Sequence, residues 1–177
     1  MDKKELRAQM KRRNRALTPD GRAAASERIF ARVERLPGFA GARCVALYCA
    51  LGDEPATEEV LRRWQADKRL VVPRVEGERM RFYEYDPAFL RQGAFGIAEP
   101  GEDARLCDPS QIDFAVIPGV VFTAGGARIG RGRGYYDRYF SQPEVRAVKA
   151  GVCYAHQLIG ELPTEPHDVF MDFVCTD

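Results

Sequence analysis

Fourteen residues in the C-terminal half of the chain have the types and spacing of an anion site. The run from Gly125 to Arg138 holds five glycines and four arginines. Glycine lets backbone N–H groups converge on an oxyanion because no Cβ stands in the way, and arginine binds phosphate oxygens in pairs. The run lies between an apolar segment, 114–117, and a predicted helix that begins near Tyr135, whose N-terminus favours anions. The spacing therefore predicts a loop that binds the phosphates of a nucleotide triphosphate.

This loop matches neither of two common nucleotide-binding motifs. No Lys-Ser or Lys-Thr pair follows its glycines, and Tyr135 stands where the dinucleotide fingerprint needs its last glycine. The pattern alone is also compatible with a flexible surface segment or with RNA binding. Asp137, at the end of the run, would hold Mg²⁺ beside the phosphates, or would stabilise the first turn of the helix.

The N-terminal region is strongly basic although the whole chain is not. Residues 1–36 hold 11 Lys and Arg against 5 Asp and Glu, whereas the 177-residue chain has a formal net charge of +1. Such a segment is compatible with a solvated helix surface, a site for an anionic small molecule, or a nucleic-acid contact. No aromatic residue precedes Phe30, which disfavours stacking on single-stranded bases. We expect no nucleic-acid partner.

Composition limits the class of protein. Hydrophobic residues make up 45% and charged residues 30%, which is typical of a globular protein and excludes a disordered one. No apolar run approaches the roughly 18–20 residues of a membrane helix, and the N-terminus has no secretory signal. Five cysteines without a C-x-x-C pair predict free thiols in a reducing compartment. We expect a cytoplasmic protein without membrane association, and we assign no role to His156 or His167.

Capping residues predict three helices before the loop. Residues 2–17 carry apolar side chains at helical spacing. Thr18 as the N-cap and Pro19 at the first helical position then open a second helix that runs to about residue 36. Thr57 is the predicted cap of the next helix, after a loop at 52–55.

Short apolar runs between these helices predict strands. Their alternation with helices indicates an α/β fold with a mostly parallel sheet, and the chain contains no linker long enough to divide it. We therefore expect one domain, 1–177, with the N-terminal helical pair (about 2–36) packed on an α/β core. The predicted strands are 44–49, 70–73, 79–85 (half-exposed or at an edge), 114–117, 148–152 and 173–175.

The loop and its flanks also resemble a known signature. Residues 118–129 and 130–140 together resemble that of the 5-formyltetrahydrofolate cyclo-ligase family, the methenyltetrahydrofolate synthetases. The resemblance implies a three-layer α/β/α fold with a mostly parallel Rossmann-like sheet, NagB/RpiA/CoA-transferase-like. Shorter segments agree in order and spacing along almost the whole chain: K-x-x-L-R at 3–7, the strand and loop at 49–54, V-P-R at 72–74, I-x-E-P at 97–100, and a late acidic residue within 165–168.

The reaction implied by this resemblance is the ATP- and Mg²⁺-dependent cyclisation of 5-formyltetrahydrofolate to 5,10-methenyltetrahydrofolate, with release of ADP and phosphate. ATP would phosphorylate the formyl oxygen, and N10 would then close the ring as phosphate leaves. Such chemistry needs positioning and charge stabilisation rather than a protein nucleophile. The partner would be a reduced folate, bound by a monomer or a weak homodimer.

The resemblance also implies roles for individual residues. The nucleotide would contact Lys3, Lys4, Glu5, Leu6, Arg7, Arg128, Ile129, Gly130, Arg131, Gly132, Arg133, Gly134, Tyr135 and Tyr136. The folate would contact Cys49, Glu54, Arg131, Gly132, Arg133, Gly134 and Tyr135. Among these, Arg131, Arg133 and Tyr135 would be catalytic, and Asp137 and Asp168 would hold Mg²⁺. Cys49 is equally compatible with a plain core thiol.

Two positions depart from the family pattern. Ala56 stands where the family usually has an acidic residue before the threonine, and Arg133 stands where some members have lysine. Arginine forks and lysine does not, so the second change affects geometry rather than reaction class. Two alternatives therefore remain: a related ATP-dependent α/β enzyme acting on another pterin-like or thiamin-like substrate, and an RNA-binding module.

Overall fold

A six-stranded sheet forms the centre of the computed structural model, which describes residues 1–93 and 96–177. Neighbouring strands in this sheet run parallel, except that β2 and β3 are antiparallel, and β3 lies at the edge. This arrangement confirms the mostly parallel sheet and the edge strand. The strands, in order across the sheet, are β11 (Phe173–Cys175), β9 (Val148–Val152), β6 (Phe114–Pro118), β1 (Cys44–Ala46), β2 (Arg69–Glu76) and β3 (Arg79–Glu84).

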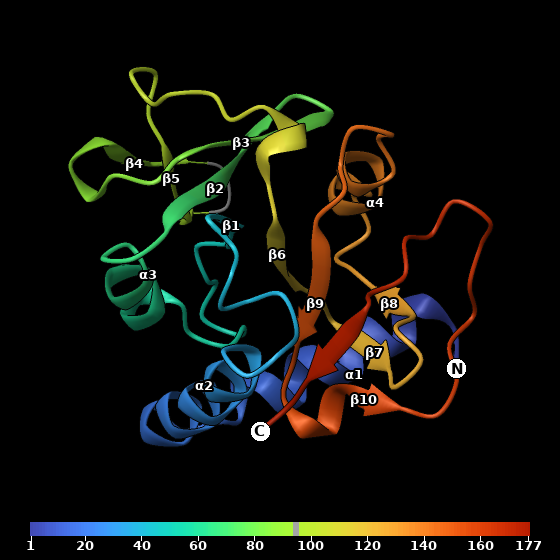
Figure 1. Ribbon diagram of the computed structural model, residues 1–177. Helices are drawn as coiled ribbons and strands as arrows, with labels where there is room; N and C mark the ends of the chain where they lie inside the picture. The colour runs from blue at the N-terminus through green and yellow to red at the C-terminus, as the bar shows by residue number, and fades with distance from the viewer. Residues whose placement is uncertain (94–95) are drawn as a thin grey trace.

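Helices cover both faces of this sheet, as Figure 1 shows. On one face, α2 (Pro19–Val33) and α3 (Glu58–Trp64) bury side chains against strand residues such as Val45 and Val116. On the other face, α4 (Tyr135–Phe140) places the Tyr139 ring 4.8 Å from that of Phe82. Strands buried on both faces read as continuous apolar runs, which is why the sequence shows them so clearly. The three-layer α/β/α fold is confirmed.

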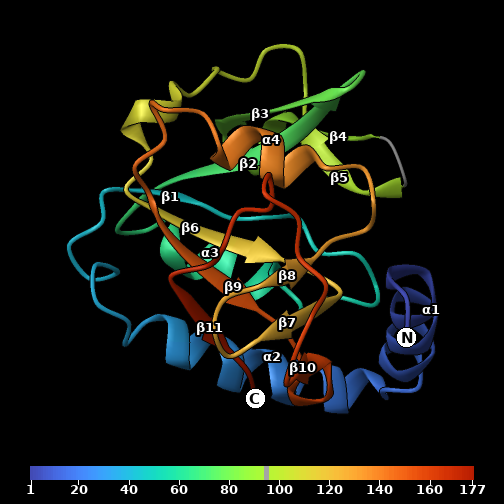
Figure 2. The ribbon, with the colours of Figure 1, turned by 90° about the vertical axis from the view of Figure 1, so that its right-hand side faces the viewer.

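The N-terminal helix α1 (Lys3–Arg15) packs on a second, smaller sheet rather than on the central one. Leu6 and Met10 are buried against Val121 and Ile129 of that sheet. Figure 2 shows α1 at one side of the molecule, beyond the small sheet. The order of the small sheet is β10 (Leu158–Ile159), β7 (Val121–Thr123) and β8 (Arg128–Ile129), and a separate hairpin joins β4 (Leu90–Gln92) to β5 (Ala98–Pro100). These short strands were not predicted.

Segment 105–107 pairs with the outer edge of the central sheet. Glu84 donates its N–H to the Arg105 carbonyl, and Cys107 donates to the Phe82 carbonyl. An isolated bridge joins Tyr83 to Leu106 between them. The antiparallel strand β3 is therefore covered along its later half by a piece of chain that belongs to no named strand.

Several predicted boundaries shift by a few residues. Thr18 caps α2 through its hydroxyl, which accepts from Gly21 N, and Pro19 opens the helix as expected. The helix ends at Val33 rather than 36, and β1 ends at residue 46 rather than 49. The predicted side-chain cap at Thr57 is wrong, because its hydroxyl accepts instead from Ala50 N at 3.0 Å.

The cysteines are all free thiols, as their spacing predicted, and Cys49 is the one that is not fully buried. None of the helices within 1–93 and 96–177 has the length and apolar character to cross a membrane.

Two adjacent glycines differ sharply in how much space surrounds them. Gly126 has φ near +90°, and a Cβ there would lie 2.2 Å from the Met171 carbonyl oxygen. Gly125 is exposed, and its Cβ would meet nothing closer than 3.8 Å. We predict that Gly126→Ala lowers the free energy of unfolding by about 2–4 kcal/mol, because strain and a backbone clash add together.

Urea denaturation would measure this difference, with Gly125→Ala as the matched control, which we expect to stay within about 0.5 kcal/mol of the parent. Equal midpoints for the two variants would contradict the close approach between Gly126 and Met171.

Candidate functional site

A cavity of about 540 Å³ opens where β1 and β6 end. In open α/β sheets the carboxyl ends of the strands are the usual place for ligands. Segments that are far apart in the sequence meet here, and nearly all the predicted site residues are among them. The lining comprises Lys3, Arg7, Tyr48, Cys49, Leu51, Glu54, Pro73, Val75, Met80, Ile97–Glu99, Pro118, Gly119, Arg128–Asp137, Glu165, His167 and Asp168.

The glycine and arginine loop connects β8 to α4 along one wall of this cavity. Gly132 and Gly134 have φ of 102° and 70°, a region that favours glycine, and Gly134 is the residue before the helix. The helix is fastened to the turn between β2 and β3. Tyr135 donates its hydroxyl proton to the Gly77 carbonyl at 3.1 Å, and Arg138 donates to the Glu78 carbonyl at 2.7 Å. These bonds hold the wall in place.

Arg128 is a buried cation in the cavity wall. Its side chain is only 5% exposed, and its Nε donates to the Pro118 carbonyl at 2.8 Å. Its Nη1 lies 3.8 Å from Asp137 Oδ1, and its guanidinium stands over the Tyr136 ring. Burial lowers the pKa of Arg128, and the nearby Asp137 opposes that shift. A cation held out of water attracts an anion far more strongly than an exposed one does.

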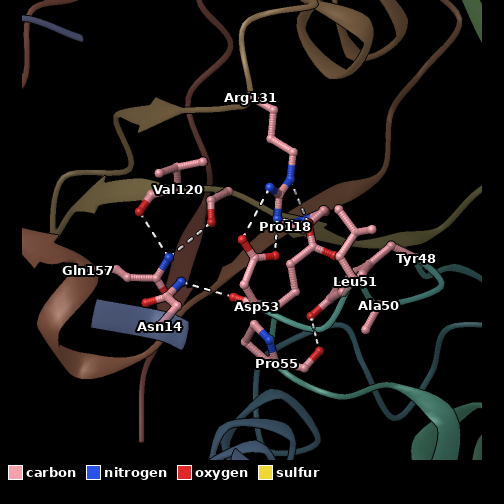
Figure 3. Close-up of polar contacts among 12 residues, drawn as sticks. Asn14, Tyr48, Ala50, Leu51, Asp53, Pro55, Pro118, Val120, Arg131 and Gln157 are labelled. Atoms are coloured by element: carbon pink, nitrogen blue, oxygen red, sulfur yellow. Dashed lines mark hydrogen bonds and ion pairs between the residues drawn. The ribbon is translucent and has the colours of Figure 1, made fainter. Parts of the chain in front are cut away.

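Arg131 joins the loop to the segment after β1 (Figure 3). Its Nη2 lies 2.6 Å from Asp53 Oδ1 and 3.0 Å from Glu54 Oε1. The second oxygen of Glu54 accepts from Leu51 N at 2.8 Å. Burial raises the pKa of Glu54, while the charge of Arg131 works in the opposite direction. Glu54 is thus a buried carboxylate on the cavity wall, kept near one cation.

Acidic residues from two segments gather at the far side of the cavity. Asp137 Oδ1 accepts from Val169 N at 3.2 Å, so the two predicted Mg²⁺ ligands, Asp137 and Asp168, adjoin the same short segment. Ligand atoms of Glu165, His167 and Asp168 lie within 4.8 Å of one another. This group contains Asp168 but not Asp137, and its two carboxylates are the oxygen donors that Mg²⁺ prefers.

The first turns of α1 bring two cations to the cavity. Lys3 Nζ lies 3.6 Å from Glu165 and 3.8 Å from Asp168, and Arg7 Nε donates to the Gly130 carbonyl at 2.8 Å. Residues four apart share a helix face, as expected for this pair. The three residues between them do not line the cavity: Lys4 is exposed, Glu5 pairs with Asp2 in a capping box, and Leu6 is buried in the core.

Other predicted residues lie at the cavity as well. Arg133, Ile129 and Cys49 line it, and burial raises the pKa of the Cys49 thiol to about 11. A thiol with this pKa is neutral at physiological pH, so Cys49 offers bulk and a weak contact rather than a nucleophile.

Three residues at the site received no role in the sequence analysis: Glu165 and Tyr48, which line the cavity, and Asp53, which contacts Arg131. Asp53 pairs with Arg131 across 78 positions of sequence, a separation over which no periodic pattern carries a signal. The available hint was its place in the loop at 49–54, which carries part of the resemblance, directly before Glu54. Glu165 lies within the segment 165–168 that carries the resemblance, and Tyr48 directly precedes Cys49, so roles assigned to whole segments would have included both.

Comparison with known proteins assigns the chain to a family. A model described as the 5-formyltetrahydrofolate cyclo-ligase family matches residues 1–177. The chain belongs to this family. It is 31% identical over 182 residues to the 5-formyltetrahydrofolate cyclo-ligase of Escherichia coli K12, with 94% of the chain and 96% of that protein covered. It is 27% identical to the enzyme of that name from Mus musculus, with 97% and 92% covered.

Two solved structures of 5,10-methenyltetrahydrofolate synthetases share the fold of this chain. The 5,10-methenyltetrahydrofolate synthetase of Aquifex aeolicus matches with a TM-score of 0.87 and 35% identity, over 99% of this chain and 89% of that one. The synthetase of Mycoplasma pneumoniae matches with a TM-score of 0.81 and 26% identity, over 100% and 99%. The resemblance read from the sequence is confirmed, and so is the expectation of an enzyme.

The burial of Glu54 in its charged form should lower the stability of the fold at neutral pH. A carboxyl whose pKa is raised by folding costs stability at pH values above that pKa, and the cost vanishes as the pH falls below its unfolded value of about 4.5. We predict that Glu54→Gln raises the free energy of unfolding by about 1 kcal/mol at neutral pH, and that this gain disappears in acid.

Urea midpoints across the pH range would measure the gain, with Glu161→Gln, an exposed carboxylate in a loop, as the control. A Glu54→Gln variant that is less stable than the parent at neutral pH would show that the bonds from Arg131 and Leu51 outweigh the burial.

Proposed function

We propose that this protein catalyses the ATP- and Mg²⁺-dependent cyclisation of 5-formyltetrahydrofolate to 5,10-methenyltetrahydrofolate, releasing ADP and phosphate. The observation that carries the proposal is a single cavity in a member of the cyclo-ligase family. That cavity collects an arginine and glycine loop, a buried carboxylate at Glu54, and two acidic side chains at Asp137 and Asp168. Phosphate, a pterin ring and a divalent cation are the groups that such residues bind.

The nucleotide is assigned to the loop from Arg128 to Tyr136 and to the two cations of α1. Positive charge comes from two elements: the buried guanidinium of Arg128 in β8, and the side chains of Lys3 and Arg7 on α1. Gly132 and Gly134 have positive φ and no Cβ, so the backbone there could approach phosphate oxygens closely. Lys4, Glu5 and Leu6 are left out of this proposed site because none of them reaches the cavity.

The folate is assigned to the side of the cavity formed by Cys49 and Glu54. The Glu54 carboxylate would accept from the adjacent N–H donors of the pterin, and its burial strengthens such bonds. Apolar walls at Val75 and Met80 would cover the ring faces. The residues proposed as catalytic, Arg131, Arg133 and Tyr135, line the same cavity and would lie between the two ligands.

The proposed reaction needs no covalent intermediate with the protein. The formyl oxygen attacks the γ-phosphorus and displaces ADP, and N10 then attacks the activated formyl carbon. The former formyl oxygen leaves with phosphate, and the N10 proton passes to solvent. Arg131 and Arg133 would stabilise the charge on the transferring phosphoryl group and on the leaving phosphate. Asp137 and Asp168 would hold Mg²⁺, which neutralises phosphate charge when bound.

We also propose a cell compartment and an assembly state for this protein. Five free thiols fit a reducing environment, and we place the reaction in the cytoplasm. For the assembly state we propose a monomer or a weak homodimer. A related ATP-dependent reaction on another pterin-like or thiamin-like substrate is the second candidate, because Ala56 lacks the acidic group usual in the family.

The direct test is absorbance of the methenyl product. Purified protein with Mg·ATP and 5-formyltetrahydrofolate should give a growing methenyl signal, and the same mixture without ATP should give none. A flat trace from folded protein would reject the proposed substrate. Binding of 5-formyltetrahydrofolate that left ATP affinity unchanged would favour the second candidate.

Two substitutions test the assignment of roles. We predict that Asp137→Asn and Arg131→Ala each reduce turnover by about a hundredfold or more, because each removes charge stabilisation. Arg12→Ala, an exposed cation on α1, should leave turnover unchanged. Circular dichroism would establish that the variants are folded, and unchanged turnover in both would reject the site.

A further inference from the structure

Glu99 is a buried carboxylate on the cavity wall that has no part in the proposed function. It lies in β5, within the segment 97–100 that carries part of the family resemblance. Its side chain is 12% exposed, and Ile97 and Ala98 line the cavity beside it. A carboxylate held largely out of water needs hydrogen-bond donors or a charge partner.

The surrounding protein gives this carboxylate little compensation. Within residues 1–93 and 96–177, its side chain accepts one hydrogen bond, from Arg91 Nη2 to Oε1 at 3.4 Å, which is long for such a bond. Arg91 is 46% exposed and also lies 3.9 Å from Glu102. An exposed and divided ion pair contributes little. Most of the roughly four acceptor positions of Glu99 therefore have no donor among these residues.

A contact between β5 and β2 places Glu99 on the side of the cavity assigned to the folate. Arg74 of β2 donates from Nη1 to the Gly101 carbonyl at 2.8 Å, just after the end of β5. The two strands lie beside each other in Figure 1. Val75 follows Arg74 and lines the cavity. Glu99 therefore lies near the apolar wall that would cover the ring faces.

The pterin ring offers more donors than Glu54 can accept from. Oε1 of Glu54 accepts from Nε and Nη2 of Arg131, and Oε2 accepts from Leu51 N. These bonds fill three of the roughly four acceptor positions of a carboxylate. The reduced pterin carries N–H groups at its amino substituent, at N3 and at N8. Glu54 alone would leave most of them unpaired, and a buried donor without an acceptor weakens binding.

We propose that Glu99 is a second substrate-binding carboxylate, which accepts from ring N–H donors of the reduced pterin that Glu54 leaves unpaired. The inference rests on the proposed function. An ionised carboxylate offers only acceptors, and its bonds to N–H groups are stronger than those of a neutral acceptor. The other carboxylates of the lining gather at the far side of the cavity: Asp137, Glu165 and Asp168.

Steady-state kinetics in the absorbance assay tests this role. We expect Glu99→Ala to raise KM for 5-formyltetrahydrofolate about tenfold, while KM for ATP changes less than about twofold. Glu99→Gln keeps one acceptor oxygen without the charge, so it should give a smaller rise of about threefold. Glu102→Gln is the matched control, because this exposed carboxylate also lies near Arg91, and it should match the parent.

Arg91→Ala separates substrate binding from a structural ion pair. If Glu99 served only the ion pair, loss of Arg91 would raise KM for the folate as much as loss of Glu99. We expect instead a change of less than about twofold, because the contact with the ring remains.

An unchanged KM for the folate in both Glu99 variants would overturn the inference, and so would equal rises in Arg91→Ala and Glu99→Ala. A parent protein without ATP-dependent product formation would instead overturn the proposed function, so the two failures are distinct.

Discussion

The parallel pairing of β1 with β6 is the constraint on which the site depends. Val45 lies opposite Phe114 in this pair, so both strands run toward the same edge of the sheet. The segment that holds Glu54 and the segment that leads to Arg131 must therefore leave the sheet together. Backbone pairing brings two charged loops within hydrogen-bond distance, and the ion pairs of Arg131 with Asp53 and Glu54 follow from that position rather than cause it.

The N-terminal helix α1 links three segments around the cavity. Through Lys3, Arg7 and Asn14 it contacts three different segments: the acidic turn at 165–168, the glycine loop, and the loop that carries Asp53. The apolar face of α1 is buried on the small sheet, which fixes the helix axis. A short amphipathic helix is marginal alone, so its order depends on these contacts.

Some parts of this structure could be predicted from the sequence, and others could not, for identifiable reasons. The strands 44–46 and 114–118 are buried throughout and read as apolar runs, and Thr18 with Pro19 marks a helix start through local chemistry. Two- and three-residue strands such as β8 give no periodic signal. The pairing of Asp53 with Arg131 depends on tertiary geometry, and Thr57 lost its capping role to a tertiary hydrogen bond.

The chain segment that covers β3 has a consequence for the behaviour of the protein in solution. A sheet edge with free N–H and C=O groups is a template for pairing with a second molecule. Here one edge strand is partly covered by residues 105–107 and carries Arg79 and Arg81, while the opposite edge strand, β11, is only three residues long. Both borders of the central sheet thus offer little free backbone for edge-to-edge pairing with another molecule.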